Sequence, residues 1–400
     1  MDLGNRLKER RERAALTQEY VARQLGLSRE ILSTWETGTR MPNTKQLDLL
    51  AKLYRTELAY LISGQKERNR DRDLLFQDLP NSQEVRKAFT SWLDFLDNWA
   101  AFIAASGESL PGPGRPPRAL DQGGNITDAR KAPTLAVETR NELKLASDAI
   151  HDIETLLDEQ NILVYKSSIE SDDQKDTVSG AFYNHPELGY CIFVNTHQKN
   201  ARVRFTLAHE FSHALYHYRM GGIISRNGDK NPREVFANVF AAHFLVPGKA
   251  LREHINDIGG KEFLDSFQAF RLAFHFNVSY SMMLFRLNSE KLINSDEMNE
   301  WAQLNVKTLA RKWGIRASDN YFADAVDTQP THANTLGLAH YPLSVLKRIK
   351  TSYERKKVNV EQAAHLLCVS EQDLLDGLLQ PKPNPDSLDL LELADLLTIR

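Results

Sequence analysis

The sequence predicts an α+β protein that is mostly helical, with a five-helix N-terminal domain, a small sheet in a central domain and a helical C-terminal region. Three observations support this fold class. Residues 3–64 show short stretches of helical periodicity separated by tight glycine breaks. The middle of the chain alternates helical patterns with short apolar runs that are typical of strands. From Trp301 onward the periodicity is again mostly helical.

The chain is long for one domain, because 400 residues are expected to form two or three. We place domains at residues 1–64, 125–300 and 301–400, with a connector at residues 65–124. The composition, with 42% hydrophobic and 26% charged residues and a net charge of −3, is that of a soluble globular protein.

Neither membrane insertion nor export is expected. No apolar run approaches the length that crosses a bilayer, and the first residues are charged where a signal peptide would be apolar. We therefore expect a cytoplasmic protein without a membrane partner. Its two cysteines, Cys191 and Cys368, lie far apart and predict neither a disulfide framework nor a thiolate metal cluster. A metal site must then be built from histidine and carboxylate side chains.

The N-terminal domain has the pattern of a helix-turn-helix unit. An amphipathic basic helix is predicted over residues 3–13, and Thr17 is a good N-cap for a second helix. Gly26 then provides a turn, and Ser28 caps a third helix over residues 29–36. A helix, a glycine turn and a capped second helix are typical of DNA-binding units of this kind.

The second and third helices separate an apolar face from a polar one. Their apolar residues are expected to form a small core: Val21, Leu25, Leu27, Ile31 and Trp35. Six polar residues are candidate DNA contacts: Gln18, Ser28, Arg29, Glu30, Ser33 and Thr34. Phosphate contacts are expected from Gln18 and from four basic residues, Arg10, Arg11, Arg13 and Arg40.

The stretch from Leu16-Thr-Gln to Trp35-Glu-Thr-Gly-Thr-Arg-Met-Pro42 resembles the Xre/Cro-type DNA-binding domain. This resemblance implies sequence-specific binding to double-stranded operator DNA. We also expect a homodimer, because one such module buries too little surface for tight specific binding and paired half-sites overcome this. The alternative is a small helical module that dimerises or docks without binding DNA.

The connector is predicted to contain one aromatic helix between irregular flanks. Residues 65–73 form a charged run, and residues 107–124 are too rich in proline and glycine for regular structure. Between them, residues 84–104 predict one helix whose large apolar side chains recur at three- and four-residue spacing. This face is expected to be ordinary core, packed on the central domain, or else to pair with its copy in a dimer.

Short strands are predicted between a helix at residues 139–160 and a histidine-rich helix. We expect them at residues 162–165, 181–183 and 190–195. The last strand leads toward the histidine-rich helix. If its edge is exposed, an extended peptide substrate can add to it through main-chain hydrogen bonds.

The histidine-rich helix contains His209-Glu-Phe-Ser-His213, which has the pattern His-Glu-x-x-His. Residues four apart lie on the same face of a helix, so both imidazoles can bind one tetrahedral metal ion, for which zinc is the best candidate. Glu210 can then reach a water molecule in the open coordination position and take its proton. The flanking residues are apolar, which predicts a buried helix, and buried histidines need partners.

A third ligand is expected from a second apolar helix that ends at Pro247. Glu234 lies near its start and completes a His, His, Glu site. Asn238 follows one turn later and is expected to hydrogen-bond a ligand histidine. His217 is a weak candidate ligand, because three successive turns of one straight helix do not converge easily on one ion. His243 lies ~2.5 turns past Glu234 and is expected to face away from the site.

The two motifs resemble the ImmA/IrrE family of metallopeptidases. The resemblance rests on Arg204-Phe-Thr-Leu-Ala-His-Glu-Phe-Ser-His213, on Glu234-Val-Phe-Ala-Asn-Val-Phe-Ala-Ala-His-Phe-Leu-Val-Pro247 and on residues 272–287. It implies a zincin-like domain in which the matching histidines and Glu234 bind Zn2+ and Glu210 is the catalytic base. His243 departs from the acidic or neutral residue that we would expect at its position in this family.

The C-terminal region, residues 301–400, is expected to bind a partner or a signal. Helical patterns at residues 341–350 and 358–375 predict a helix and a second helix-turn-helix-like unit, with Ser370 as a cap. Similar tails occur in longer members of the family that the central motifs resemble. Few positive charges lie around Glu361, which favours a partner over DNA.

Together these parts predict a DNA-binding transcriptional regulator fused to a zinc-dependent peptidase. The resemblance implies that its substrate is a repressor or antitoxin-like protein, or the chain itself, cut in a stress, DNA-damage or phage response. One alternative is a regulator whose peptidase-like domain senses a signal without hydrolysis. Another is an antitoxin or phage-defence component that acts through protein contacts. Glu210 favours hydrolysis, because a purely structural metal site does not need this base.

Overall fold

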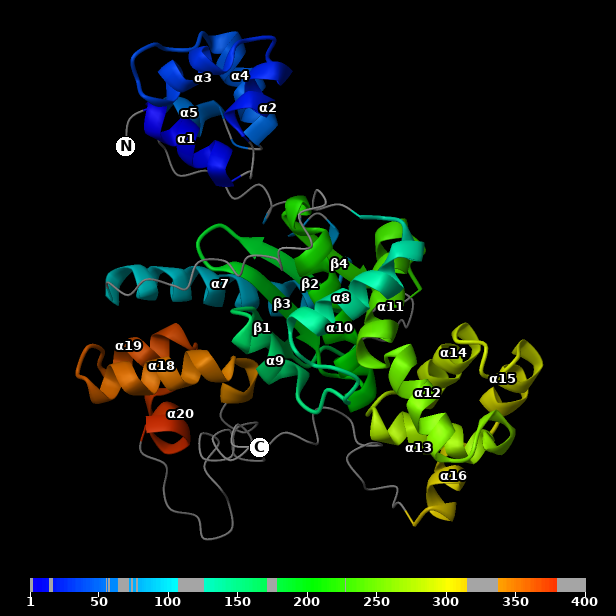
Figure 1. Ribbon diagram of the computed structural model, residues 1–400. Coiled ribbons are helices and arrows are strands. Elements are labelled where there is room, and N and C mark those ends of the chain that lie inside the picture. The colour runs from blue at the N-terminus through cyan, green and yellow to red at the C-terminus, as the bar shows by residue number, and fades with distance from the viewer. Residues whose placement is uncertain are drawn as a thin grey trace. The chain divides into compact units, whose positions relative to one another are not determined.

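A computed structural model describes residues 3–13, 17–54, 56, 58–63, 72, 75–76, 78–106, 126–170, 178–226, 228–314 and 337–379. The chain forms two compact units, within residues 1–77 and 78–400 (Figure 1). The predicted Pro/Gly-rich segment at residues 107–124 lies outside the described residues, as does the charged run at residues 65–73 apart from Arg72. None of the described helices is both long and apolar enough to cross a membrane.

The described part of residues 3–63, in the first unit, forms a bundle of five helices, as predicted. The helices are α1 (Leu3–Arg13), α2 (Gln18–Gln24), α3 (Arg29–Glu36), α4 (Thr44–Tyr54) and α5 (Leu58–Ser63). Gly26 joins α2 to α3 with a φ of 67°, which glycine adopts without strain. Val21 and Trp35 belong to the buried core, as expected, whereas three other predicted core residues are only partly buried: Leu25, Leu27 and Ile31.

The second unit is built around a four-stranded sheet. Its strands are β1 (Leu163–Ser167), β2 (Val178–His185), β3 (Gly189–Asn195) and β4 (Gly222–Arg226). They are arranged in the order β1-β3-β2-β4, with β1 and β3 parallel and the other neighbours antiparallel. The three predicted strands are confirmed, and β4 is an additional strand.

β3 is a central strand, so the condition for peptide addition to it, an exposed edge, is not met. Its backbone pairs with β1 on one side and with β2 on the other. β3 is buried along its whole length, as expected for a strand with an uninterrupted apolar run. The outer strands of this sheet are β1 and β4. His340 reaches β1 and donates a hydrogen bond from Nδ1 to the carbonyl oxygen of Lys166.

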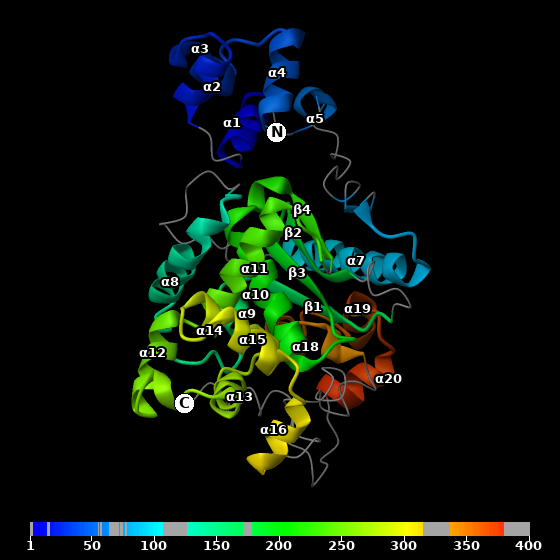
Figure 2. The same cartoon turned by 90° about the vertical axis from the view of Figure 1, so that its right-hand side faces the viewer.

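One face of the sheet is covered by α10 (Asn200–Tyr216), which contacts β2 and β3 (Figure 2). α11 (Pro232–Leu245) packs against α10, and α8 (Ala132–Glu142) packs against α11. These three helices and the sheet share one hydrophobic core. α10 is therefore held between the sheet and a second layer of helices.

The opposite face is covered by α7 (Gln83–Ser106), which is the predicted aromatic helix (Figure 2). Its Phe89 and Trp92 rings lie 4.7 Å and 5.5 Å from the Phe193 ring of β3, measured between centroids. Both side chains are fully buried. The aromatic face of α7 is therefore core, and the helix belongs to the same compact unit as the sheet instead of to a separate connector.

The predicted helix at residues 139–160 is wrong in its middle. α8 ends at Glu142, and α9 (Ile153–Glu159) begins only after a loop. Two buried guanidinium groups hold this loop: Arg140 donates to three of its carbonyl oxygens and Arg204 to two. The arginines thus pair backbone groups that a continuous helix would have paired internally.

In residues 228–314, which the structure describes, five further α-helices follow α11: α12 (Gly248–Asp257), α13 (Ser266–His275), α14 (Tyr280–Ser289), α15 (Ser295–Ala302) and α16 (Val306–Lys312). The C-terminal region adds α18 (Leu343–Glu354), α19 (Val360–Leu366) and α20 (Glu371–Leu374). Ser370 caps α20 by accepting a hydrogen bond from the Asp373 backbone, as predicted. Tyr341 packs on Phe95 of α7 with ring centroids 4.8 Å apart, so the C-terminal helices adjoin the α7 side of the sheet.

Candidate metal centre

α10 places His209 and His213 one turn apart on a buried surface. The helix is buried almost throughout, because its apolar residues contact both the sheet and the neighbouring helices. The centroids of the two imidazole rings lie 4.8 Å apart. His209 is 5% exposed and His213 is fully buried, so both rings need polar partners inside the protein.

α11 brings Glu234 to these two histidines. Asn231 caps the helix by accepting a hydrogen bond from the Arg233 backbone, which fixes Glu234 in the first turn. Glu234 Oε2 lies 3.0 Å from His209 Nε2, and Oε1 lies 3.2 Å from His213 Nε2. The structure thus brings the three predicted ligands together, with one ligand atom from each lying within 4.8 Å of the others.

Asn238 fixes the tautomer of His209. Its Oδ1 atom lies 3.0 Å from His209 Nδ1. Since an amide oxygen only accepts hydrogen bonds, Nδ1 carries the proton and Nε2 keeps its lone pair toward Glu234. The structure therefore places Asn238 beside a ligand histidine, in the position that the sequence predicts for it.

His217 fixes the tautomer of His213 in the same way. His217 Nε2 lies 2.7 Å from the carbonyl oxygen of Ile126, so this nitrogen carries the proton. His217 Nδ1 is then an acceptor, and His213 Nδ1 donates to it across 2.8 Å. His213 Nε2 keeps its lone pair as a result. His217 therefore orients His213, a predicted ligand, and is not itself one of the three predicted ligands. Its spacing of four residues after His213 is the sequence signal for this contact.

Three hydrogen-bond acceptors consequently converge with no proton assigned between them. His209 Nε2 and His213 Nε2 lie 3.1 Å apart, and the carboxylate of Glu234 faces both. Such lone pairs repel one another unless a cation lies among them. Two imidazole nitrogens and one carboxylate are a donor set that suits Zn2+ and leaves one coordination position for water.

The surroundings also favour the protonation states that bind a metal. Burial lowers the pKa of His213, and it lowers the pKa of His217 to about 3, so both rings are neutral at neutral pH. Burial alone would raise the pKa of Glu234; hydrogen-bond donation and positive charge from the two ring nitrogens beside it lower this pKa, and a metal cation bound there would act in the same direction. Neutral imidazole and ionised carboxylate are the forms that act as metal ligands.

Glu210 is enclosed next to this ligand group. It is fully buried, and neither carboxylate oxygen has a hydrogen-bond partner among the described residues. Burial raises its pKa well above the usual value; the nearby Ser225 hydroxyl opposes this shift, and the carboxylate of Glu234 adds to it. In its ionised form such a carboxylate is a stronger proton acceptor, and a cation at the neighbouring ligand group would favour that form.

Gly180 of β2 provides the space that Glu210 occupies. A Cβ atom at Gly180 would lie 2.7 Å from Glu210 Oε1 and 2.7 Å from the Cγ2 methyl of Thr206. Contacts this short are not tolerated, so a larger residue must displace Glu210 or α10. Gly180 is not among the predicted site residues, although a glycine within a strand often marks a close approach of another group.

His243 lies away from the metal-binding group. Its Nε2 is 3.2 Å from Arg286 Nη1, and burial together with this guanidinium lowers the pKa of His243 to about 4. Arg286 is fully buried and also donates to the Val246 carbonyl and to Glu290. The pair therefore ties the end of α11 to α14.

The predicted DNA contacts lie on α3 and at the start of α2. Of these, Ser28, Arg29 and Glu30 are exposed, and Ser33 and Thr34 are half-buried. Gln18 donates from Nε2 to Glu36 Oε2 at 2.8 Å and accepts from Arg29 Nε at 3.4 Å. Gln18 therefore links α2 to α3 and holds Arg29 at the surface.

The prediction that Arg11 contacts phosphate is wrong. Arg11 is 8% exposed, and its Nε and Nη2 atoms bind the two carboxylate oxygens of Glu36 at 2.6 Å and 3.0 Å. Glu36 is itself buried and needs this charge partner. The side chain of Arg13 lies outside the described residues, whereas Arg40 is exposed.

A helix-turn-helix bundle followed by a His, His, Glu centre defines a class of protein that combines a DNA-binding domain with a metallopeptidase-like domain. Residues 158–288 match the family described as the IrrE N-terminal-like domain, and residues 7–61 match the family described as helix-turn-helix. The chain therefore carries a helix-turn-helix domain and a domain of the IrrE-like metallopeptidase family.

Two curated proteins are similar to parts of the chain. The HTH-type transcriptional activator BcrR of Enterococcus faecalis is 28% identical over 115 residues, which cover 28% of this chain and 53% of BcrR. The HTH-type transcriptional regulator ImmR of Bacillus subtilis (strain 168) is 37% identical over 76 residues, which cover 19% of this chain and 60% of ImmR. The chain thus spans little more than half the length of these relatives. No solved structure matches it.

Proposed function

We propose that this protein is a DNA-binding transcriptional regulator whose second unit is a zinc-dependent endopeptidase. The observation that carries the proposal is the convergence of three metal-binding acceptors beside a buried carboxylate that has no hydrogen-bond partner among the described residues. A zinc ion held by His209, His213 and Glu234 would polarise a peptide carbonyl and lower the pKa of bound water. A metal site with a purely structural role would not need Glu210.

Glu210 is the proposed general base. It takes a proton from the attacking water and later gives the same proton to the leaving amine nitrogen, so the proton count balances over one cycle. Burial raises the pKa of Glu210, which makes its ionised form a stronger base for the first transfer, from water. In the second transfer Glu210 acts as the acid and protonates the leaving amine nitrogen. The enclosure formed by Gly180 and Ser225 keeps the carboxyl close to Glu234.

Strand β4 is the proposed support for the substrate backbone. Among the described strands it pairs only with β2, so its other edge offers main-chain donors and acceptors. Ser225 on β4 lies close enough to Glu210 to influence its pKa. An extended peptide that adds to this edge would therefore run past the base.

The exposed face of α3 is the proposed operator-reading surface. Ser28, Arg29 and Glu30 lie at the start of this helix, which is the part of a recognition helix that contacts base edges in the major groove. We propose a cytoplasmic homodimer, because two half-sites supply the contact area that one module lacks. The similarity to BcrR and ImmR, which are named as transcriptional regulators, supports this role.

The proposed substrate is a repressor or antitoxin-like protein, or the chain itself, cut in a stress, DNA-damage or phage response. This part of the proposal rests on the match to the IrrE-like family. The alternative is a regulator or antitoxin in which the peptidase-like domain senses a signal or partner and proteolysis is not essential.

One experiment separates these readings. The full-length chain and its Glu210→Gln variant are purified from cells and compared by metal analysis and by mass spectrometry of co-purified proteins. We expect equimolar zinc in both, and an uncut protein partner that accumulates only on the variant. If Glu210→Gln keeps its zinc and regulates its target promoter as the wild type does, hydrolysis is not the function and the sensing alternative takes its place.

A further inference from the structure

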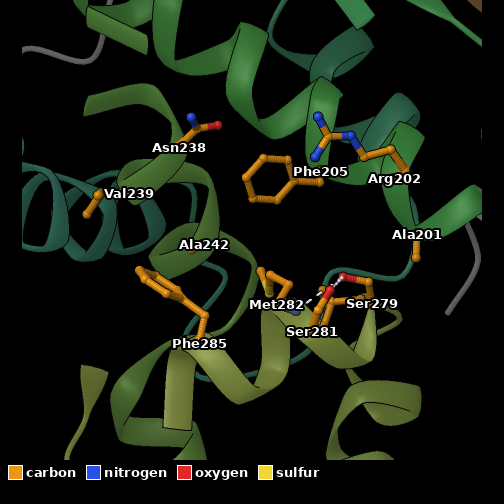
Figure 3. A pocket seen from close by; sticks show the side chains of 11 residues that line it. Ala201, Arg202, Phe205, Asn238, Val239, Ala242, Ser279, Ser281, Met282 and Phe285 are labelled. Carbon is orange, nitrogen blue, oxygen red and sulfur yellow. Dashed lines mark hydrogen bonds between the residues drawn. The ribbon is translucent and has the colours of Figure 1, made fainter. Parts of the chain in front are cut away.

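A pocket of about 320 Å³ is lined by residues from the N-terminal half of α10, the middle of α11 and the start of α14 (Figure 3). Two residues connect the pocket to the ligands. Asn238 lines the pocket and binds His209 Nδ1, and the Phe205 ring lies 6.4 Å from the His209 ring, measured between centroids. The pocket therefore borders His209, one of the three predicted ligands, and a side chain of a peptide bound at the candidate metal centre can reach it.

The walls of the pocket are mainly apolar and partly open to solvent. They are formed by Phe205, Val239, Ala242, Val278, Met282 and Phe285. Phe285 is 48% exposed, and Val239 and Met282 are only half-buried. Covering such apolar surface in a concave site with an apolar group removes it from water, which favours binding. A methionine in the wall also adapts its shape to different occupants.

Several polar side chains of the pocket interact with neighbouring groups of the protein. The Ser279 and Ser281 hydroxyls lie 3.2 Å apart, and Ser279 Oγ also accepts a hydrogen bond from the Met282 backbone. Arg202 lies over the Phe205 ring at 5.5 Å from its centroid. The described residues that line the pocket include no carboxylate, so a lysine or arginine side chain would meet no opposite charge from them and would approach Arg202.

We infer that this pocket receives one large apolar side chain of the substrate, of the leucine, methionine or phenylalanine class, next to the bond that is cut. The inference rests on the proposed peptidase function, because it requires the peptide backbone to lie at the metal centre. The volume of about 320 Å³ is ample for one such side chain.

The binding part of the inference is tested without hydrolysis. The full-length Glu210→Gln variant is labelled with ¹³C-methyl methionine, and Met282 is assigned among the six methionines with Met282→Leu. Acetylated glycine peptides with one central Leu, Phe, Ala, Asp or Lys are then titrated. We expect the Met282 methyl signal to shift with Leu and Phe at concentrations where Ala, Asp and Lys have no effect. The exposed Met41 of the first unit is the internal control.

The specificity part is tested by filling the pocket. Val239→Phe should lower kcat/KM for a leucine peptide by roughly 100-fold relative to an alanine peptide, since a few methylene groups in a hydrophobic pocket are worth this much discrimination. Val137→Phe, on the exposed side of α8, is the matched control and should leave the preference unchanged. Zinc content is measured in each protein.

The outcomes separate this inference from the peptidase proposal. If peptides are cut with equal preference for Leu, Ala and Lys, or if Asp peptides shift Met282 most strongly, the apolar specificity is wrong while the peptidase assignment holds. If no peptide is cut but Leu and Phe still shift Met282 selectively, the pocket assignment holds and the hydrolytic function is in question. If Met282 responds to none of the peptides, the pocket assignment is wrong.

Discussion

The metal centre and the DNA-facing helix α3 hold their functional groups in opposite ways. At the metal centre, no predicted ligand is more than 5% exposed, and Asn238 and His217 occupy the second ring nitrogen of each ligand histidine. On α3, Arg29 and Glu30 are exposed. Buried chemistry depends on preorganisation, so one substitution is expected to abolish it. DNA recognition by an exposed helix depends on several contacts, so one substitution is expected to weaken binding only in part.

The largest effect is expected from Glu234→Ala. The change leaves two imidazoles without the carboxylate that completes the donor set, so zinc in the purified protein should fall from equimolar to background and peptide cleavage should be lost. DNA binding by the first unit should not change in gel-shift assays. Glu253→Ala, which removes an exposed carboxylate on α12, is the matched control. Equimolar zinc in Glu234→Ala would show that the ligand assignment is wrong.

Gly180→Ala should separate the base from the ligands. The added methyl group requires space that Glu210 Oε1 and the Thr206 methyl now fill, so the base must move. A displacement of about 1 Å is expected to lower kcat by about 100-fold, with zinc content unchanged. Metal analysis and peptide cleavage measure the two quantities on the same sample. Full activity in this variant would mean that the observed position of Glu210 is not the one that catalysis uses.

His217 is expected to act through His213 alone. His217→Leu removes the acceptor for His213 Nδ1 and should weaken zinc binding by about 10- to 100-fold, as measured by competition with a chelator. His217→Gln can both accept from His213 and donate to the Ile126 carbonyl, so it should restore most of the affinity. If both variants bind zinc as the wild type does, the tautomer of His213 is set by something other than His217.

The parts of the candidate site that the sequence predicts are those that local spacing determines. His209 and His213 are four residues apart on one helix, and helical geometry alone places them on one face. Glu234 is predictable because it is a carboxylate in an otherwise apolar helix. In the first unit, Gly26 and the start of α3 follow from turn and cap preferences.

The parts that the sequence does not predict depend on contacts between distant residues. The carbonyl of Ile126 meets His217 across 91 residues, and a backbone carbonyl has no sequence signature. Arg140 interrupts a predicted helix because its guanidinium finds loop carbonyls, which no periodicity reveals. The central position of β3 likewise depends on its pairing with β1 on one side and β2 on the other, which the order of the strands along the chain does not reveal. Local sequence patterns therefore predict which side chains form the candidate site. Contacts between distant residues determine what each side chain does there.

A smaller effect is expected on DNA binding by the exposed helix α3. Arg29→Ala should weaken operator binding by about 1–3 kcal/mol, which is the usual range for one base contact, and should relax specificity at one position. Zinc content should not change. Arg23→Ala, an exposed arginine at the end of α2, controls for the loss of one positive charge. Unchanged gel shifts for Arg29→Ala would count against α3 as the recognition helix.

The smallest effect is expected on the pH dependence of stability. It tests the buried metal centre in the zinc-free protein. His217 has a pKa of about 3 in the folded protein against an ordinary value of 6.5, so between these values the unfolded chain binds a proton that the folded chain does not. The neutral His217 ring therefore contributes fully to the free energy of unfolding above pH 6.5, and this contribution is lost as the pH falls toward 3. The free energy of unfolding should change by at most about 1.4 kcal/mol per pH unit from this group.

Urea unfolding of the zinc-free wild type and His217→Gln from about pH 7 to about pH 5 measures this slope, because glutamine does not titrate in that range. The wild type should lose stability more steeply than His217→Gln, whereas Arg29→Ala, on the exposed face of α3, should follow the wild type. Equal slopes for wild type and His217→Gln would mean that His217 is protonated in the folded protein. It would then be unable to accept a hydrogen bond from His213, and the lone pair of His213 would no longer be directed at Glu234 by this contact.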